Sequence, residues 1–306
     1  MGWPICGQSL AFLKPHSSNS MGTFLQKQCS KYGRIFKSHL FGSPAIVSCD
    51  QELNMFVLQN EEKLFLASYP KPMHGILGKY SLLIVSGELH KKLRNVAVSF
   101  IGSSKSTPAF LRFVEKLALS MMESWKQHKR DCEEIRKARA RLSSTVRDII
   151  KQRKTEKPGL REEDFLDVIL SKQSLRDAET VSIVLDILLG GYETTTTLIP
   201  LIVYFLAHSP NVYQRLKVIS ESMRCGNVVK FVHREAIRDV KFKDYVIPSG
   251  WKVLPVLAGV HFDPSLHENP SEFNPRRWSN NDKATMSKTV MPFWGRTATL
   301  PRRRTC

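Results

Sequence analysis

An acid and a hydroxyl stand side by side within the most apolar part of the sequence. Glu193 and Thr194 follow two glycines, Gly190 and Gly191, in a segment otherwise rich in Leu and Ile. Glycine costs about 1 kcal/mol in a helix interior, so the pair indicates either close approach of a flat ligand or a local bulge. A buried carboxyl needs a partner, and beside a hydroxyl it can relay protons to a reaction centre. The other interpretation is a polar kink whose threonine bonds back to its own helix.

Two shorter patterns carry charge in the second half of the chain. Glu221 and Arg224 are three positions apart, so on a helix their side chains share a face and can pair. Further on, Pro275 restricts the backbone of a loop in which Arg277 precedes Trp278. Each pattern alone is common on protein surfaces, and neither by itself predicts a reaction.

The elements that must position these residues are mostly helical. Apolar periodicity predicts helices over residues 53–59, 87–100, 108–129, 133–154, 179–208 and 212–224. Alternating runs predict a hairpin over 35–40 and 45–48, and strands over 228–231, 240–247 and 251–257. The sequence therefore predicts a mostly α fold with a small β region near each end. The helix over 179–208 should be buried, because it is apolar on most faces.

Composition narrows the class of protein. With 42% hydrophobic and 24% charged residues among 306, the chain is typical of globular proteins. The net charge of +18 can attract nucleic acid or an anionic membrane, but its densest segment, 126–157, has few aromatic residues and indicates a solvated helix face. Six scattered cysteines without a CxxC pair favour reduced thiols, and no metal-ligating cluster is assigned. The longest uncharged apolar run, 194–207, is shorter than the about 20 residues that a membrane span needs.

In this order, the three patterns together resemble the cytochrome P450 superfamily. The family's central-helix pattern, Ala/Gly-Gly-x-Asp/Glu-Thr-Thr/Ser, is met at 190–195. Its ExxR pattern is met at Glu221 and Arg224, and its Pro-x-Arg-Phe/Trp pattern at 275–278. The resemblance implies a P450 fold, incomplete in this chain, with haem as cofactor.

The resemblance also implies roles for the residues of these patterns. Glu193 and Thr194 would be catalytic, lying over the haem iron and delivering protons to bound dioxygen. Glu221, Arg224 and Arg277 would form a buried, salt-bridged structural triad on the haem side of the core.

Three further cations are implied to hold the haem. His90 and Arg94 stand where the family has Trp-x-x-x-Arg, with His in place of Trp as in its plant steroid branch. They would contact one haem propionate, and Arg234 would contact the other. Charge-assisted pairing with a carboxylate is the physical reason for arginine there. The alternative for each residue is an ordinary surface cation.

Several segments resemble the plant brassinosteroid hydroxylases, with the C-22 hydroxylase group as the nearest fit. These segments are residues 2–4, 12–16, 32–38, 61–65 and 224–229. By this resemblance, the loop over 67–83 would line a sterol pocket, with Met73 and Leu77 as substrate contacts.

The spacing of the patterns departs from the family. Between Arg94 and Thr194 the chain is too short for the full set of middle helices, which predicts a deletion near 129–132. Between Thr194 and Glu221 it allows the central helix to end and the ExxR helix to follow almost at once, which predicts a join near 217–218. Residues 1–292 are therefore interpreted as a partial P450 domain with internal deletions.

The last residues, 293–306, depart further. The family expects Phe-x-x-Gly-x-Arg-x-Cys-x-Gly, whose thiolate binds the iron. After Phe293 the chain has no cysteine at that position, and Cys306 lacks the surrounding glycines. Codons for Thr299 to Arg302 can encode Leu-Cys-Pro-Gly when read one base later. We therefore interpret 293–306 as an aberrant tail produced by loss of the reading frame near Phe293.

Three functions from different classes follow. By resemblance, the chain is a haem-thiolate monooxygenase that hydroxylates a plant sterol or brassinosteroid precursor. Its partners would be the sterol and an NADPH-dependent P450 reductase, on the cytosolic face of the endoplasmic reticulum membrane. The alternative is a catalytically inactive P450 remnant, and the third is a basic nucleic-acid binder, which is disfavoured because it rests on charge alone. In the family, the segment at which Met1 begins follows a membrane anchor. The chain is therefore expected to lack the anchor, and the cytoplasm is its other expected location.

Overall fold

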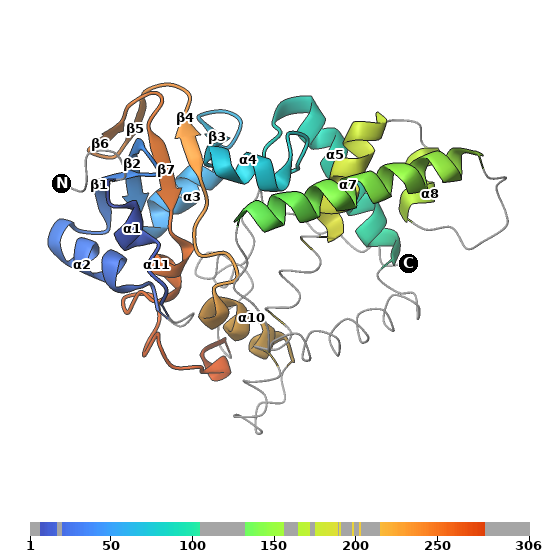
Figure 1. Cartoon of the computed structure of the whole chain (residues 1–306). Coiled ribbons are helices and arrows are strands. Elements are labelled where there is room, and N and C mark those ends of the chain that lie inside the picture. Colours follow the sequence, from blue (N-terminus) through green and yellow to red (C-terminus); the bar gives the residue numbers. More distant parts are fainter. Residues whose placement is uncertain are drawn as a thin grey trace. The chain divides into compact units, whose positions relative to one another are not determined.

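The chain folds into two compact units. The computed structural model describes residues 7–16, 20–104, 132–155, 165–171, 175–188, 190, 198, 202 and 215–278. Unit 1 comprises Met1–Ser68 and Leu201–Cys306, and unit 2 comprises Tyr69–Pro200 (Figure 1). The predicted helix over 108–129 and most of the one over 179–208 lie outside the described residues.

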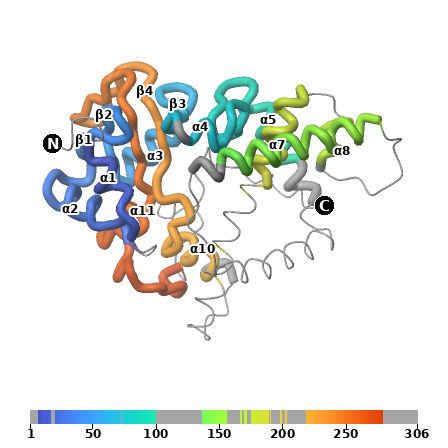
Figure 2. The backbone as a smooth tube through the Cα atoms, viewed as in Figure 1, coloured from blue at the N-terminus to red at the C-terminus, as the bar shows by residue number. Residues whose placement is uncertain are grey.

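Unit 1 is built on a five-stranded sheet that joins both ends of the chain. In sheet order the strands are β1 (Ile35–Leu40), β2 (Ser43–Ser48), β7 (Lys252–Pro255), β4 (Arg234–Ala236) and β3 (Phe65–Ala67). The pairing of β2 with β7 is parallel, and the other pairs are antiparallel. The blue start and the orange end of the chain therefore run side by side in Figures 1 and 2. The predicted hairpin is confirmed, and so are the small β regions near each end of the chain, whose strands meet in this sheet.

Two of the predicted strands differ from the structure. Residues 228–231 are not a strand, and only Phe231 forms an isolated bridge, with Val256. The predicted strand over 240–247 is a tight hairpin of β5 (Val240–Phe242) and β6 (Tyr245–Ile247). Its turn holds Lys243 at a φ of +51°, which a continuous strand does not allow.

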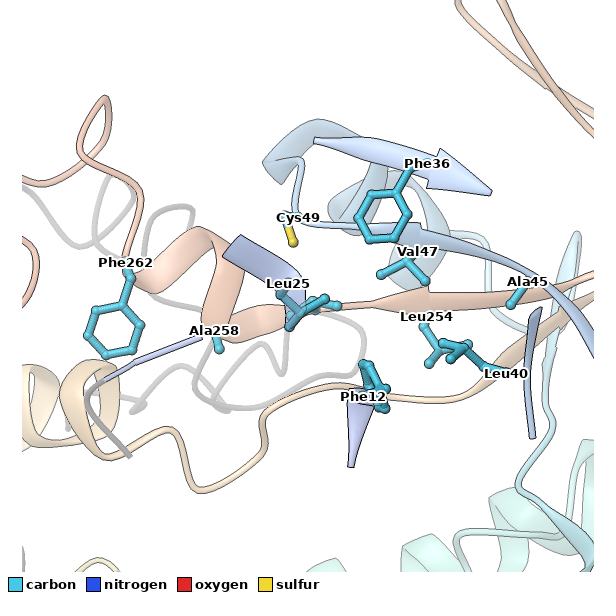
Figure 3. Packing of buried hydrophobic residues seen from close by; sticks show 11 residues of the cluster. Phe12, Leu25, Phe36, Leu40, Ala45, Val47, Cys49, Leu254, Ala258 and Phe262 are labelled. Atoms are coloured by element: carbon cyan, nitrogen blue, oxygen red, sulfur yellow. The ribbon is translucent and has the colours of Figure 1, made fainter. Parts of the chain in front are cut away.

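The helices of unit 1 are α1 (Ser9–Phe12), α2 (Thr23–Tyr32), α3 (Gln51–Gln59), α10 (Arg215–Gly226) and α11 (Leu257–His261), followed by a 3₁₀ turn at Pro275–Trp278. Residues of α1, α2, α3 and α11 pack against the sheet, whereas α10 packs against α11 and the 3₁₀ turn. The predicted helix over 53–59 is confirmed as α3, and its start is fixed by Asp50, whose side chain accepts the Leu53 N–H at 2.8 Å. Phe36 and Val47 from the hairpin and Leu254 from β7 are neighbours across adjacent strands and belong to one buried cluster (Figure 3).

Unit 2 is helical in its described part. Its helices are α4 (Lys71–Leu77), α5 (Gly87–Ser104), α7 (Cys132–Thr155), α8 (Phe165–Ser171) and residues 177–188. The predicted helices over 87–100 and 133–154 are confirmed. The expected loop over 67–83 is in part wrong, because it contains α4, which begins after Pro70 and ends at Gly78 with a φ of +80°. Leu93, Ile169 and Ile183 are buried between α5, α8 and 177–188.

The fold class predicted from the sequence, mostly α with a small sheet, is confirmed. The basic segment of α7 is exposed at Arg136, Lys137 and Arg141, as a solvated helix face should be, whereas Arg139 is half-buried. None of the described helices combines the length and the apolar composition that a membrane span needs.

Candidate functional site

Unit 1 contains a buried carboxylate that accepts hydrogen bonds from two arginines. On α10, Glu221 and Arg224 lie almost one turn apart, and both are fully buried. Arg224 donates from Nε to Glu221 Oε2 at 3.0 Å and from Nη2 to Oε1 at 2.7 Å, a bidentate pair. Arg277, from the 3₁₀ turn, donates from Nε to Oε1 at 3.0 Å. The structure thus brings together the three residues that the sequence groups as a structural triad.

Two further donors reach the same carboxylate. The indole Nε1–H of Trp278 donates to Glu221 Oε2 at 2.9 Å, and the backbone N–H of Asn274 donates to Oε1 at 2.9 Å. Sequence analysis missed both, since it treated Trp278 only as the aromatic residue of its motif. A buried indole N–H needs an acceptor, which is the signal that could have assigned it. Glu221 therefore accepts five hydrogen bonds from nitrogen donors through two oxygens, and the Cys225 thiol adds a weaker one to Oε1 at 3.9 Å.

Backbone carbonyls satisfy the remaining arginine donors. Arg224 donates from Nη1 to His261 O at 2.8 Å and to Pro270 O at 2.6 Å, and from Nη2 to Glu272 O at 3.0 Å. Arg277 donates from Nη1 to Glu268 O at 2.7 Å. The network thereby fixes the segment between α11 and the 3₁₀ turn onto α10.

Electrostatics keep Glu221 ionised in this buried position. Burial alone would raise the pKa of Glu221. The hydrogen bonds and charge of Arg224, the N–H of Asn274 and the charge of Arg277 outweigh burial and lower that pKa. The carboxylate therefore acts as a fixed anion and does not exchange protons near neutral pH.

A buried histidine connects α10 to α11. His261 Nδ1 lies 2.7 Å from Asn227 Oδ1, so the ring donates its N–H to the amide oxygen. Burial, followed by the charges of Arg224 and His267, lowers the pKa of His261 to about 3. The ring is neutral at physiological pH and serves as a hydrogen-bond donor.

Known proteins share this arrangement of elements. The cytochrome P450 family pattern matches residues 128–217 and 216–298. A rice (Oryza sativa subsp. japonica) protein named cytochrome P450 724B1 is 43% identical, with 96% of this chain and 79% of the relative covered. The chain belongs to the cytochrome P450 family.

Other P450 relatives are named for steroid oxidation. A cholesterol 22-monohydroxylase of Trigonella foenum-graecum is 32% identical, with 92% of this chain and 75% of that protein covered. A steroid (22S)-hydroxylase of Brachypodium distachyon is 31% identical, with 97% and 76% covered. Among solved structures, a retinoic acid-bound cyanobacterial CYP120A1 matches with a TM-score of 0.76 at 21% identity, over 96% of this chain and 85% of that one, which shows the P450 fold.

The P450 relatives are longer than this chain within the matched region. The alignment with the rice protein extends over 383 positions, more than the 306 residues of the chain. Residues present in the relative are therefore missing from the interior of this sequence.

The P450 family implies haem, and one described cation suits its carboxylates. Arg234 on β4 is fully buried in unit 1. Its Nη2 lies 3.0 Å from Glu61 Oε1, and its Nη1 donates to His233 O at 2.8 Å. Burial, then the charges of Arg234 and Lys252, lower the pKa of His233 to about 4. A buried guanidinium beside a neutral ring has the chemistry to hold a carboxylate such as a propionate.

Two buried cysteines, Cys225 and Cys49, suit the haem iron less well. Burial raises the pKa of the Cys225 thiol to about 12, although the charge of Arg224 opposes the shift. The pKa of Cys49 is also raised well above its usual value, first by its interaction with Cys29 and then by burial. Because the axial ligand of a P450 is a thiolate, these two residues do not fit that position. Cys306 lies outside the described residues.

The other residues assigned from the sequence belong to unit 2. On α5, His90 is half-buried and Arg94 is exposed. On α4, Met73 is half-buried and Leu77 is buried. Glu193 and Thr194 lie outside the described residues.

Proposed function

We propose that this chain represents a P450 monooxygenase that hydroxylates the side chain of a plant sterol. The observation that carries the proposal is its similarity, over at least 92% of its length, to relatives named as steroid and cholesterol 22-hydroxylases. The buried Glu221 network supports it, because it is built from two of the family's own motifs. The proposed site of hydroxylation, carbon 22 of the sterol, is taken from the names of these relatives.

Three residues of the chain are proposed to bind the haem. The haem, when bound, supplies the iron that activates dioxygen. Arg234 would neutralise one propionate within unit 1, and His90 and Arg94 on α5 would bind the other. Buried charge-assisted hydrogen bonds of this type are stronger than neutral ones, so Arg234, which is fully buried, should contribute most.

The remaining residues are proposed to act on protons, packing and substrate. Glu193 and Thr194 would hold and pass protons in the reaction. Met73 and Leu77 on α4 would contact the sterol. Glu221, with both arginines of its network, would keep the core rigid beneath the cofactor. An NADPH-dependent P450 reductase would supply electrons at the endoplasmic reticulum membrane.

The second candidate function is a catalytically inactive remnant of such an enzyme. Four observations favour it. The family match stops at residue 298 and the ligand position after Phe293 has no cysteine. The match is also split at 216–217, beside the join predicted at 217–218, and the rice relative has residues that the interior of this chain lacks. The protein would then be a partial P450 domain over 1–292 with an aberrant tail over 293–306.

One measurement separates the two functions. The purified chain is reconstituted with haem, reduced, treated with carbon monoxide and compared with a variant whose residues 293–306 carry the family's cysteine loop. A thiolate-type absorption band from the chain itself supports the monooxygenase, and its loss in Cys306→Ser or Cys225→Ser identifies the ligand. A band only from the variant with the restored loop supports the inactive remnant. Sequencing the transcript across codon 293 then tests the loss of frame, and an uninterrupted frame with unrelated codons contradicts it.

A further inference from the structure

A short turn in unit 2 is held by more than its own backbone. After α4 ends, Ser81 N–H donates to Gly78 O at 3.1 Å, and Ser81 O accepts the N–H groups of Ile84 and Val85 at 2.9 Å each. Ser81 is fully buried. These bonds curl residues 78–85 into a compact turn that leads from α4 to α5.

The turn is anchored to the helix at 177–188 by a carboxylate. Asp186 Oδ2 accepts the backbone N–H of Leu82 at 2.7 Å, and the Ser81 side chain also hydrogen-bonds to Asp186. Leu82 itself packs against the cluster that contains Leu93 and Ile183. One side chain of the helix at 177–188 thus holds two consecutive residues of the turn. The apolar contact of Leu82 beside it holds the turn close to that helix.

A cation from a third helix completes the cluster. Arg139 on α7 is half-buried, and its charge acts on Asp186. A Cβ placed on Gly78 would come within 2.5 Å of Arg139 Nη2, so the guanidinium lies directly against the end of α4. The cluster of Asp186, Arg139 and Ser81 therefore connects α4, α7 and the helix at 177–188 at one point.

We propose that Asp186, together with Arg139, is a positioning residue that sets the place of α4 and so the shape of the sterol pocket. This role rests on the proposed function, because Met73 and Leu77 on α4 are the proposed sterol contacts. Asp186 hydrogen-bonds to neither of them, and it acts through the turn that follows α4. Loss of the anchor lets α4 shift and weakens sterol binding without removing any substrate contact.

The test compares Asp186→Asn with Asp177→Asn in the full chain. Asp177 lies on the same helix, is exposed and pairs with Lys154 at 2.6 Å, so it controls for the chemical change. The readouts are amide hydrogen exchange at Leu82 and equilibrium binding of radiolabelled cholesterol. Since the half-buried acceptor loses its negative charge and its attraction to Arg139, the Leu82 N–H is held by a weaker acceptor, and we expect exchange at Leu82 to be about tenfold faster and cholesterol binding about tenfold weaker in Asp186→Asn. Asp177→Asn should match the wild-type chain in both.

The outcomes distinguish this inference from the proposed function. Unchanged exchange at Leu82 overturns the anchor. Faster exchange with unchanged cholesterol affinity overturns the role in the pocket and leaves the proposed function standing. A wild-type chain that binds no cholesterol overturns the proposed function and the pocket role with it. If Asp186→Asn does not fold, Ser81→Ala removes one of the same hydrogen bonds without changing charge, and the same two readouts decide.

Discussion

At the scale of single residues, Glu221 shows how a buried charge is tolerated. Its two oxygens accept hydrogen bonds from Arg224, Arg277, Trp278 and the Asn274 backbone. These bonds replace the ones that the carboxylate would form with water, and they offset its desolvation free energy. Buried ion pairs contribute little net stability when intact, but breaking one leaves the partner charge uncompensated. The network therefore matters most for the uniqueness of the fold around α10.

Replacing Glu221 by Gln should be severely destabilising. The buried guanidinium of Arg224 and the partly buried one of Arg277 would then face an amide without negative charge, which costs about 3 to 5 kcal/mol. Urea denaturation followed by circular dichroism measures the loss. Glu268→Gln, an exposed residue of the same unit, should stay within about 0.5 kcal/mol of the wild-type chain. A Glu221→Gln variant as stable as this control would show that the network is not a single ionic unit.

His233 should make the stability of unit 1 depend on pH. In the folded chain its pKa is lowered to about 4, whereas in the unfolded chain it is about 6.5. The unfolded state therefore binds the proton first as pH falls, and the stability that is complete above pH 6.5 is lost progressively toward pH 4. Between pH 7 and pH 5 this single ring should account for a loss of about 2 kcal/mol.

The variant His233→Phe isolates that contribution. Phenylalanine keeps a ring against Phe41 and Phe231, which both meet His233 edge-on, but it binds no proton. Its free energy of unfolding should fall by about 2 kcal/mol less than that of the wild-type chain between pH 7 and pH 5. Equal losses in the two proteins would contradict a neutral His233 in the folded state.

The sequence predicted part of this network and missed the rest for a physical reason. The spacing of Glu221 and Arg224 is local, so a helix alone suffices to pair them. The Asn274 N–H and the Asp186 anchor depend on segments that meet only after the chain has folded. No pattern within a short window of sequence contains that information.

At the scale of elements, α11 lies unusually close to the end of β2. A Cβ placed on Gly259 would come within 2.5 Å of Cys49 Cβ and 2.9 Å of Cys49 Cα, and a backbone atom cannot turn aside as a long side chain can. Glycine is required at this helical position because of the close approach of the two elements, and not because of a special backbone angle.

Gly259→Ala should therefore destabilise the chain although alanine is the better helix former. Propensity favours alanine by about 1 kcal/mol, but the overlap with Cys49 should reverse the sign and cost a net of about 1 to 3 kcal/mol. Gly190→Ala is the matched control, since nothing lies within 4 Å of a Cβ there. That control should be neutral or more stable in urea, and a Gly259→Ala variant that behaves like it would contradict the contact.

Long periodic elements were predicted, and short ones were not. α3, α5 and α7 present apolar residues at helical spacing over several turns, which the sequence displays directly. β3 and β4 have three residues each, too few for an alternating pattern, and they exist because the rest of the sheet pairs with them. α2 was missed because its mean composition is polar and the segment before it is rich in Gly and Ser.

At the scale of the whole molecule, the order of elements along the chain differs from their order in space. Unit 2 is one continuous segment, whereas unit 1 is assembled from the residues on either side of it. The distant pairing of β2 with β7 could not be deduced from local pattern, although each strand lies within a segment that local pattern predicts. Contacts between residues so far apart in sequence slow folding, because a large loop must close first.

This topology also delays the completion of the sheet while the chain is being synthesised. Ala45 pairs with Lys252, so the ribosome must add about two hundred residues before the first hairpin meets its parallel neighbour. At a synthesis rate of about 5 to 20 residues per second, the edge of β2 that will pair with β7 stays unpaired for about 10 to 40 seconds. During that interval its backbone donors and acceptors can pair with any other nascent strand. The yield of folded protein should therefore depend on the chaperones that cover this edge while translation proceeds.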